Sequence, residues 1–551
     1  MKIWYKIFIL VLTLTSTLYL FTPCSLKAQE RPLTVAESSQ FTETSRYADV
    51  MEFIKKLQEN SSLIRVEKLC VTTEGRDVPL LVIGNPPPSS PFDLKHDKRA
   101  VVYFQANIHA GEVEGKEASL MLARDIIFND KHNLLKNLVI LIAPIFNADG
   151  NEKISPENRR NQMGPEKGVG VRYNGQNLDL NRDSMKMESP ELQGLVRNVL
   201  MRWDPLFVLD SHTHNGSYHE EPVTYVWGLN PNGDASLISY MRDKMMPAVS
   251  EILREEYNIL SVPHGDFIDA KNPEKGWRPL GPQPRYISNY IGLRNRLSIL
   301  NENYPYKDFK ERIEGCYYFF LSILDYCSAH KEEIQKLISL TDKKTVQRGI
   351  NPFDEDSFIL EYDLEPMDRK ITVLGYEMEV VEREGSWPRI TKTDKKRTYN
   401  IPYLCNYVSK RSIRFPYAYL IPLPVPEIAE KLLQHGITVE RLTKSVKLQV
   451  ETFNIKEIKS MERIYQGHHM NTVKGEYIQE TREFPEGTLF ISTAQTLANV
   501  AAYLLEPESD DGLLVWNFFD RYIVPQWGTR FQTYPVYRLL NPTHVAKEVI
   551  R

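Results

Sequence analysis

The first half of the chain alternates between short apolar runs and longer amphipathic segments. The mostly apolar runs lie at residues 101–106, 138–145, 206–209 and 297–300, and the helical patterns at residues 117–128 and 311–338. Continuous apolar runs separated by helices are typical of strands that are buried on both faces of a parallel sheet. The sequence therefore predicts an α/β fold with a mixed, largely parallel sheet flanked by helices.

The pattern changes after a polar segment at residues 341–356, which we interpret as a linker. Beyond it, strand-like alternation is mixed with short helical patterns. Strands are expected at residues 370–382, 417–421, 437–441, 447–453 and 488–492, and helices at residues 426–434 and 496–506. We therefore expect a first domain at residues 29–340 and a second, mixed α/β domain of unknown role at residues 357–551.

The N-terminus has the pattern of an export signal. Lys2 and Lys6 precede an apolar run at residues 7–21, which is shorter than the roughly 20 residues that a membrane-spanning helix needs. We expect a signal peptide at residues 1–28, export to the periplasm or the extracellular space, and no stable membrane span after cleavage. An uncleaved anchor and a lipid anchor at Cys24 remain as alternatives.

The overall charge argues against nucleic acid as a partner. The chain has 68 Lys and Arg against 72 Asp and Glu, a formal net charge of −4, so there is no basic excess to neutralise phosphates. Only four cysteines follow the predicted signal peptide. Cys316 and Cys327 are eleven residues apart in a helical pattern, or about 16 Å, which is beyond disulfide reach. We expect free thiols.

Metal-ligand residues follow three of the four predicted strands of the first domain. His109 and Glu112 come after the first strand, His212 and His214 after the third, and Glu302 after the fourth. Because ligands of such sheets collect beyond the carboxyl ends of the strands, these side chains are expected to converge. Two imidazoles and one carboxylate form a three-ligand zinc site with an open fourth position, beside which a further carboxylate acts as a base.

Six short motifs occur in a fixed order. They are Glu74-Gly75-Arg76, His109-x-x-Glu112, Asn147-Ala148-Asp149-Gly150, Asp179-Leu180-Asn181-Arg182, Asp210-x-His212-Thr213 and Glu302. Each is weak alone, but in this order they resemble the zinc metallocarboxypeptidase family of carboxypeptidase A type. The resemblance covers about residues 72–338, and the chain looks like a secreted bacterial-type member with a C-terminal extension.

The resemblance implies a metal centre with assigned roles. His109, Glu112 and His212 would hold one Zn²⁺ per catalytic domain, and Asp179 would accept a hydrogen bond from the far nitrogen of His109. Glu302 would be the general base that deprotonates a zinc-activated water and returns the proton to the leaving amine.

The resemblance also implies a substrate site. Asn181 and Arg182 would bind the terminal carboxylate of the substrate, the latter through a charge-assisted contact. An arginine of residues 158–161 would stabilise the oxyanion, and we favour Arg160 over Arg159. A tyrosine would close over the substrate, Tyr290 or Tyr286. His214 would line the cleft, or exchange roles with His212.

These expectations favour zinc-dependent hydrolysis of peptide bonds at the C-terminus of peptides or proteins. The partner would be a peptide or protein with a free C-terminal carboxylate. Two alternatives remain. One is a peptidase or amidase that uses the same site on cell-wall peptides with D-amino-acid or diaminopimelate bonds, and the other is a non-catalytic surface binding protein. The second domain is expected to pack on the first and to restrict access to the cleft.

Overall fold

The four apolar runs form neighbouring strands of one sheet in the computed structural model, which describes residues 31–550 apart from 129, 215, 382–388, 526, 528–530 and 532. The predicted signal peptide therefore lies outside the described residues. No helix within the described ranges is both long and apolar enough to cross a membrane.

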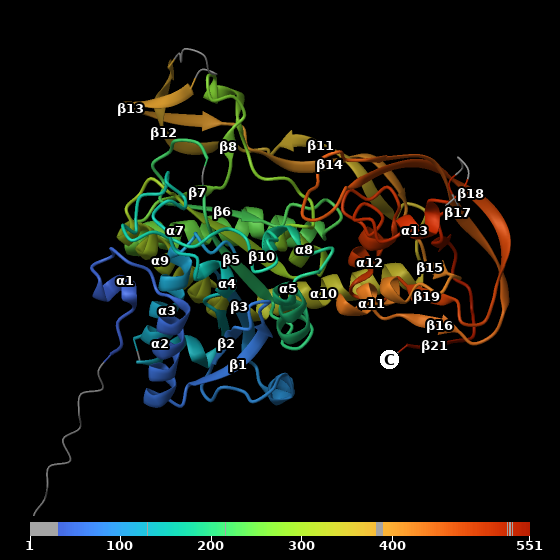
Figure 1. Ribbon diagram of the computed structural model, residues 1–551, viewed down its shortest axis with the longest axis horizontal. Coiled ribbons are helices and arrows are strands. Elements are labelled where there is room, and N and C mark those ends of the chain that lie inside the picture. Colours follow the sequence, from blue (N-terminus) through green and yellow to red (C-terminus); the bar gives the residue numbers. More distant parts are fainter. Residues whose placement is uncertain are drawn as a thin grey trace, which may run out of the picture. The chain divides into compact units, whose positions relative to one another are not determined.

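The first sheet has eight strands, and its centre is parallel (Figure 1). In spatial order the strands are β1 (Ile64–Val71), β2 (Asp77–Ile83), β4 (Leu138–Ala143), β3 (Ala100–Ala106), β5 (Phe207–Thr213), β10 (Leu297–Asn303), β6 (Val223–Trp227) and β7 (Ser261–Pro263). The pairs β4–β3, β3–β5 and β5–β10 are parallel, whereas β1, β2 and β6 add antiparallel pairs. The predicted mixed, largely parallel sheet is confirmed.

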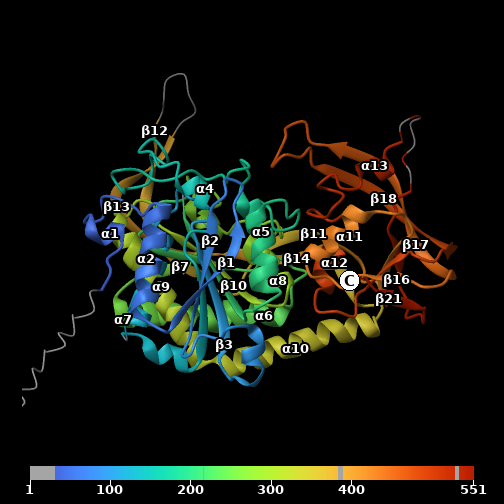
Figure 2. The ribbon, with the colours of Figure 1, turned by 60° about the horizontal axis from the view of Figure 1, so that its bottom comes forward.

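Helices cover both faces of this sheet (Figure 2). One group packs together on one side and consists of α2 (Tyr47–Asn60), α3 (Glu114–Ile127), α7 (Met246–Tyr257) and α9 (Phe309–Ala329). On the other side, α5 (Pro190–Leu195) contacts β1, and α8 (Ile287–Leu293) contacts β5 and β10. Short helices complete the layer: α1 (Val35–Ser38), α4 (Ala148–Asn151) and α6 (Ala235–Ser239). Because the strands are covered on both faces, their side chains are buried throughout, as the unbroken apolar runs predict.

The predicted helix at residues 311–338 is two helices. α9 ends at Ala329, and His330 interrupts the helical geometry before α10 (Lys331–Ile350) begins. α10 therefore occupies the first ten residues of the segment that we expected to be a linker. It contacts α6 and α9 in the first region and α12 (Ala498–Leu505) in the second.

The second region is built mainly from antiparallel strands. Its seven-stranded sheet comprises, in spatial order, β18 (Asn471–Phe484), β17 (Val446–Ser460), β20 (Tyr537–Leu539), β15 (Ala418–Ile421), β19 (Leu489–Ser492), β16 (Glu440–Leu442) and β21 (Lys547–Val549). Two further pairs are β11 (Ser357–Pro366) with β14 (Leu404–Arg414) and β12 (Ile371–Val381) with β13 (Arg389–Ile401), and a small pair in the first region is β8 (Asp266–Phe267) with β9 (Trp277–Arg278). Helices α11 (Pro426–Gln434), α12 and α13 (Asp520–Ile523) accompany the sheet.

One hydrophobic core runs through both regions. The same cluster of buried side chains includes Ile142 on β4 and Leu504 on α12. Residues 32–551 accordingly form one compact unit. Cys316 and Cys327 are buried in this core as free thiols, as predicted.

Candidate metal centre

His109 and Glu112 lie in the turn between β3 and α3. Asn107 begins this turn in the left-handed backbone region (φ 66°), which asparagine tolerates better than most residues. Its side-chain amide donates to the main-chain oxygens of Ala110 and Glu112. A local polar network thus sets the positions of both candidate ligands.

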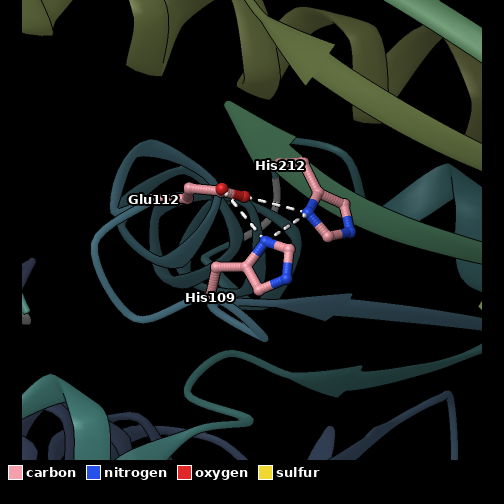
Figure 3. Close-up of side chains that lie close together, drawn as sticks. All are labelled: His109, Glu112 and His212. Carbon is pink, nitrogen blue, oxygen red and sulfur yellow. Dashed lines mark hydrogen bonds and ion pairs between the residues drawn. The ribbon is translucent and has the colours of Figure 1, made fainter. Parts of the chain in front are cut away.

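The structure brings His109, Glu112 and His212 together at the carboxyl ends of β3 and β5 (Figure 3). Nδ1 of His109 is 3.0 Å from Oε1 of Glu112, and Nδ1 of His212 is 2.9 Å from Oε2 of the same carboxylate. The two Nδ1 atoms are 3.1 Å apart. All three side chains are buried. Among the described residues, this is the single group of three or more His, Cys, Asp or Glu side chains whose ligand atoms all lie within 4.8 Å of one another.

A carboxylate contacts the Nε2 atom of each imidazole, on the side away from the cluster. Nε2 of His109 is 3.0 Å from Oδ1 of Asp179, and Nε2 of His212 is 2.6 Å from Oδ2 of Asp210. Because a carboxylate accepts hydrogen bonds, it fixes the proton of each ring on Nε2 and leaves the lone pair on Nδ1. Two Nδ1 lone pairs and a carboxylate then face one another.

Such a group of acceptors fits a cation. Two ligands bound at 2.0–2.1 Å to a tetrahedral zinc ion are about 3.3 Å apart, close to the separation of the two Nδ1 atoms. The negative charges around His212 favour a positive charge at this point. Although burial opposes protonation of the ring, Asp210 and Glu112 raise the pKa of His212 well above the ordinary value. The donor set and its spacing therefore fit Zn²⁺.

Glu302 lies beside the candidate ligands on the neighbouring strand. In the parallel register of β5 and β10, Glu302 is directly opposite His212. Its Oε2 is buried and has no hydrogen-bond partner within the described part of the chain. Burial raises the pKa of Glu302 to about 8, an effect that His212 opposes and Glu112 reinforces. A carboxylate with this environment is suited to exchange a proton near neutral pH.

The arginine that reaches the cluster is Arg159. Its Nη2 is 2.5 Å from Oε1 of Glu112, whereas the Arg160 side chain is 74% exposed and pairs with Glu157. Arg159 itself adopts a left-handed backbone conformation (φ 50°). Gly111 leaves the necessary room, because a Cβ at that position would lie 2.7 Å from Cδ of Arg159. The geometry thus reverses our preference for Arg160.

Arg172 is a second arginine at the site, and sequence reasoning missed it. Its Nε donates to Oδ2 of Asp179 at 2.7 Å, and its Nη1 is 3.9 Å from Oε1 of Glu112. Burial alone would raise the pKa of Asp179, but His109, Arg182 and Arg172 hold it well below its usual range. Arg172 lies in an irregular loop, where no periodic pattern marks it.

Asn181 and Arg182 follow Asp179 in a short 3₁₀ turn. Nδ2 of Asn181 faces Nε2 of His212 at 3.5 Å, and its Oδ1 accepts from the main-chain N–H of Ile287. The Arg182 guanidinium packs over the Tyr286 ring at 4.4 Å. Both expected carboxylate-binding residues therefore lie close to the metal cluster.

Tyr290 does not lie where we expected it. Its side chain is fully buried in α8, and its hydroxyl is 2.8 Å from Nδ1 of His435 and accepts from Arg294. The physical reason is that Tyr290 lies inside α8, which is buried on nearly all sides, whereas Tyr286 is the N-cap residue that precedes the helix. Tyr286, one turn earlier, is the tyrosine next to Arg182.

His214 does not have the role that we expected, which was to line the cleft or to replace His212 as a ligand. Its Nδ1 accepts from the main chain of Gly216 and its Nε2 is 3.2 Å from the carbonyl oxygen of Gly265, so both ring nitrogens have main-chain partners. The ring packs against His264 and His219, and burial lowers its pKa to about 4. His212, rather than His214, faces Glu112.

Asp210 is the other residue whose role the sequence analysis missed. A signal was present, because residues two apart on a strand project from the same face. An aspartate two residues before a candidate histidine ligand on a strand therefore predicts a hydrogen-bond partner for the imidazole ring of that histidine.

Comparisons with known proteins find similarity to carboxypeptidases. Residues 50–216 match the family model of zinc carboxypeptidases. Carboxypeptidase 2 of Trichophyton equinum is 22% identical over 503 residues, which cover 88% of this chain and 85% of that relative. Carboxypeptidase 2 of Trichophyton rubrum is 22% identical over 491 residues, covering 85% and 84%. The similarity to these relatives thus extends beyond the residues that match the family model.

Solved structures of carboxypeptidases are also similar to part of the chain. Carboxypeptidase A from Helicoverpa armigera has 16% identity and a TM-score of 0.38 over 54% of this chain and 75% of its own. A metallo-carboxypeptidase from Burkholderia cenocepacia has 18% identity and a TM-score of 0.39 over 51% of this chain and 69% of its own.

Proposed function

We propose that this chain, whose residues 50–216 match the family model of zinc carboxypeptidases, is a peptidase that removes C-terminal residues from peptides. One observation carries the proposal: in the cluster of His109, Glu112 and His212, His212 has Glu302 opposite it on β10 and Nδ2 of Asn181 3.5 Å from its Nε2. A candidate base and a candidate carboxylate-binding residue near the same ligands support this reaction.

His109, Glu112 and His212 would hold the zinc ion, with Asp179 and Asp210 orienting the two imidazoles. A zinc ion bound there supplies a Lewis acid for the scissile carbonyl and lowers the pKa of water. Glu302 accepts the proton of the attacking water and delivers it to the leaving amine. Its unpartnered Oε2 and raised pKa support this role.

Two arginines would bind the negatively charged groups of the reacting substrate. Arg159, which contacts Glu112, donates to the oxyanion that develops at the scissile carbonyl. Arg182 binds the terminal carboxylate of the substrate, with Asn181 as a second donor. The Tyr286 ring holds the Arg182 guanidinium by a cation–π contact, which supports this assignment because it limits the motion of that side chain.

The proposal is tested with N-blocked dipeptides that have L- or D-terminal residues. We expect release of the L-terminal amino acid, loss of activity with a chelator, and its return when Zn²⁺ is added. Arg182→Met should raise KM strongly for the free acid and leave the weak hydrolysis of the C-terminal amide unchanged. Cleavage only within longer chains would contradict the proposal, and preference for the D-terminal substrate would favour the cell-wall alternative.

We also propose that the chain is exported. Lys2, Lys6 and the apolar run at residues 7–21 support this, because together they have the composition of a secretory signal. Expression of the full chain in a bacterial host followed by N-terminal sequencing of the exported protein tests the proposal. A mature N-terminus after Ala28 is expected, and retention of all 551 residues in the cytoplasm would contradict it.

A further inference from the structure

The loop that connects β17 and β18 forms a tight turn. Tyr465 and His468 exchange two main-chain hydrogen bonds, of 2.8 and 3.0 Å, so the chain reverses at Gln466 and Gly467. Both of these residues have positive φ angles, 51° and 82°. This combination is the one that two-residue hairpin turns require, and it strongly favours glycine, asparagine or aspartate. Glutamine at the first position therefore needs another explanation.

The Gln466 side chain supplies that explanation, because it reaches the metal centre. Its Oε1 accepts a hydrogen bond of 2.8 Å from the main-chain N–H of Asp179. Asp179 is buried and is the residue whose carboxylate binds the far nitrogen of His109. A buried N–H without a partner is costly, so Gln466 stabilises the conformation in which Asp179 meets His109.

Two other contacts keep the turn in place. Nε2 of His468 is 3.0 Å from Oε1 of Glu188, and the Tyr465 ring stacks on Trp516 with ring centroids 6.3 Å apart. Through Gln466 and His468, the turn contacts both ends of the segment formed by residues 179–188. This segment includes Asn181 and Arg182.

We propose that Gln466 is a positioning residue for the metal centre, contributed by the C-terminal region. It fixes the main chain at Asp179, and thereby the orientation of His109 and the placement of the adjacent Asn181-Arg182 pair. This inference rests on the proposed function. It gives the C-terminal region a part in ordering the metal centre, through a hydrogen bond that spans 287 residues of sequence.

Two substitutions separate this role from a structural one. Gln466→Gly removes the acceptor but suits the positive φ, so the turn itself is retained. Gln466→Met keeps the approximate length of the side chain and replaces its amide by a thioether, which removes the strong acceptor. For both variants of the full chain, we expect the Zn²⁺ dissociation constant, measured by competition with a chromogenic chelator, to rise about 3- to 10-fold. At saturating Zn²⁺, KM for a blocked dipeptide should rise about 10-fold with a smaller change in kcat.

Controls come from the same loop. Gln466→Glu retains an acceptor oxygen and should restore most of the Zn²⁺ affinity that the Met variant loses. Ile464→Ser alters an exposed side chain near the turn and should behave like the unmodified protein. Melting temperatures show whether each variant is folded.

The outcomes distinguish the two proposals. Unchanged Zn²⁺ affinity and KM in the folded Gly and Met variants would overturn the role of Gln466 while leaving the proposed function intact. Absence of Zn²⁺ binding and of peptidase activity in the unmodified chain would overturn the proposed function itself. A lower melting temperature with the same Zn²⁺ affinity and KM would identify Gln466 as purely structural and would also overturn the inference.

Discussion

Oδ2 of Asp210 lies 2.6 Å from Nε2 of His212, two residues further along β5. Because both side chains project from the same face of β5, one short segment supplies a candidate ligand and the carboxylate that orients it. His109 is oriented by Asp179, which lies in a distant loop. The two imidazoles therefore present their lone pairs to the same point, and this relationship leads to the first prediction.

Asp210→Asn should weaken zinc binding. An amide cannot match the charge of the carboxylate, and it can hold the His212 ring in the wrong tautomer. Loss of a partner of this kind typically costs 10- to 100-fold in metal affinity, so we expect a rise of about that size in the Zn²⁺ dissociation constant. Competition with a chelator measures it. Gln105→Leu, which removes the other side-chain partner of Asp210, is the matched control and should have a much smaller effect.

Glu302→Gln should abolish most of the peptidase activity without removing the metal. Glutamine keeps the shape of the side chain but cannot accept a proton, and general base catalysis typically contributes about 10²- to 10⁴-fold. We expect kcat to fall within that range while zinc content, measured by atomic absorption, stays at one ion per chain. Retention of more than a tenth of the activity would rule out Glu302 as the base.

The neighbouring arginines 159 and 160 provide a paired test. Arg159→Ala should lower kcat by about 10²- to 10³-fold, because it removes a donor to the developing oxyanion. Arg160→Ala should change kcat less than twofold, because that side chain is exposed and pairs with Glu157. Steady-state kinetics on one blocked dipeptide measures both. The reverse order of effects would restore our original preference for Arg160.

Glu191→Gln should stabilise the protein at alkaline pH. Burial raises the pKa of Glu191 to about 7, above its unfolded value of about 4.5, so the folded state favours the proton. Stability from this group is complete below pH 4.5 and is lost as the pH rises toward 7. The uncharged variant avoids that loss. Its free energy of unfolding should exceed that of the unmodified chain by about 2–3 kcal/mol at pH 8.

Urea unfolding at pH 5 and pH 8 measures this difference. Glu188 is the control of opposite sign, because although burial opposes ionisation, His468 and Lys186 lower its pKa to about 2. Glu188→Gln should therefore destabilise the protein near neutral pH, by an amount that shrinks as the pH falls toward 2. Equal pH dependence for both variants would contradict the assignment of the raised pKa to Glu191.

The central sheet and the metal cluster were predictable because two simple rules apply to them. Unbroken apolar runs identify β3, β5 and β10 as buried parallel strands, and ligand residues of such a sheet gather at the carboxyl ends of the strands. His109, His212 and Glu302 all follow these rules. No detail of side-chain packing was needed to bring them together.

The errors arose where these rules do not apply. Arg159 and Arg160 lie in an irregular loop, where no periodic pattern indicates that Arg159 contacts Glu112 while Arg160 is exposed. Tyr290 was misplaced although its helical spacing from Ile287 and Ile291 gives the pattern of a core position.

The second region was harder to predict for a different reason. Strand β17 runs from Val446 to Ser460, but the sequence indicated only residues 447–453, because the outer half is exposed and polar. Long hairpin strands that face solvent lose the alternation that identifies a strand. The contact between Gln466 and Asp179 joins residues 287 positions apart, and no local pattern encodes it.

The hydrogen bonds of His435 link the second region to residues 185 and 290 of the first. Its ring nitrogens lie against the hydroxyl of Tyr290 and the carbonyl oxygen of Met185, and Lys431 donates to the carbonyl oxygen of Met187. A fragment that ended at residue 340 would lack these contacts and the one from Gln466. The segment 179–188, which includes Asn181 and Arg182, would then lose partners that hold it in the full chain, so truncation before the second region should disturb the candidate site.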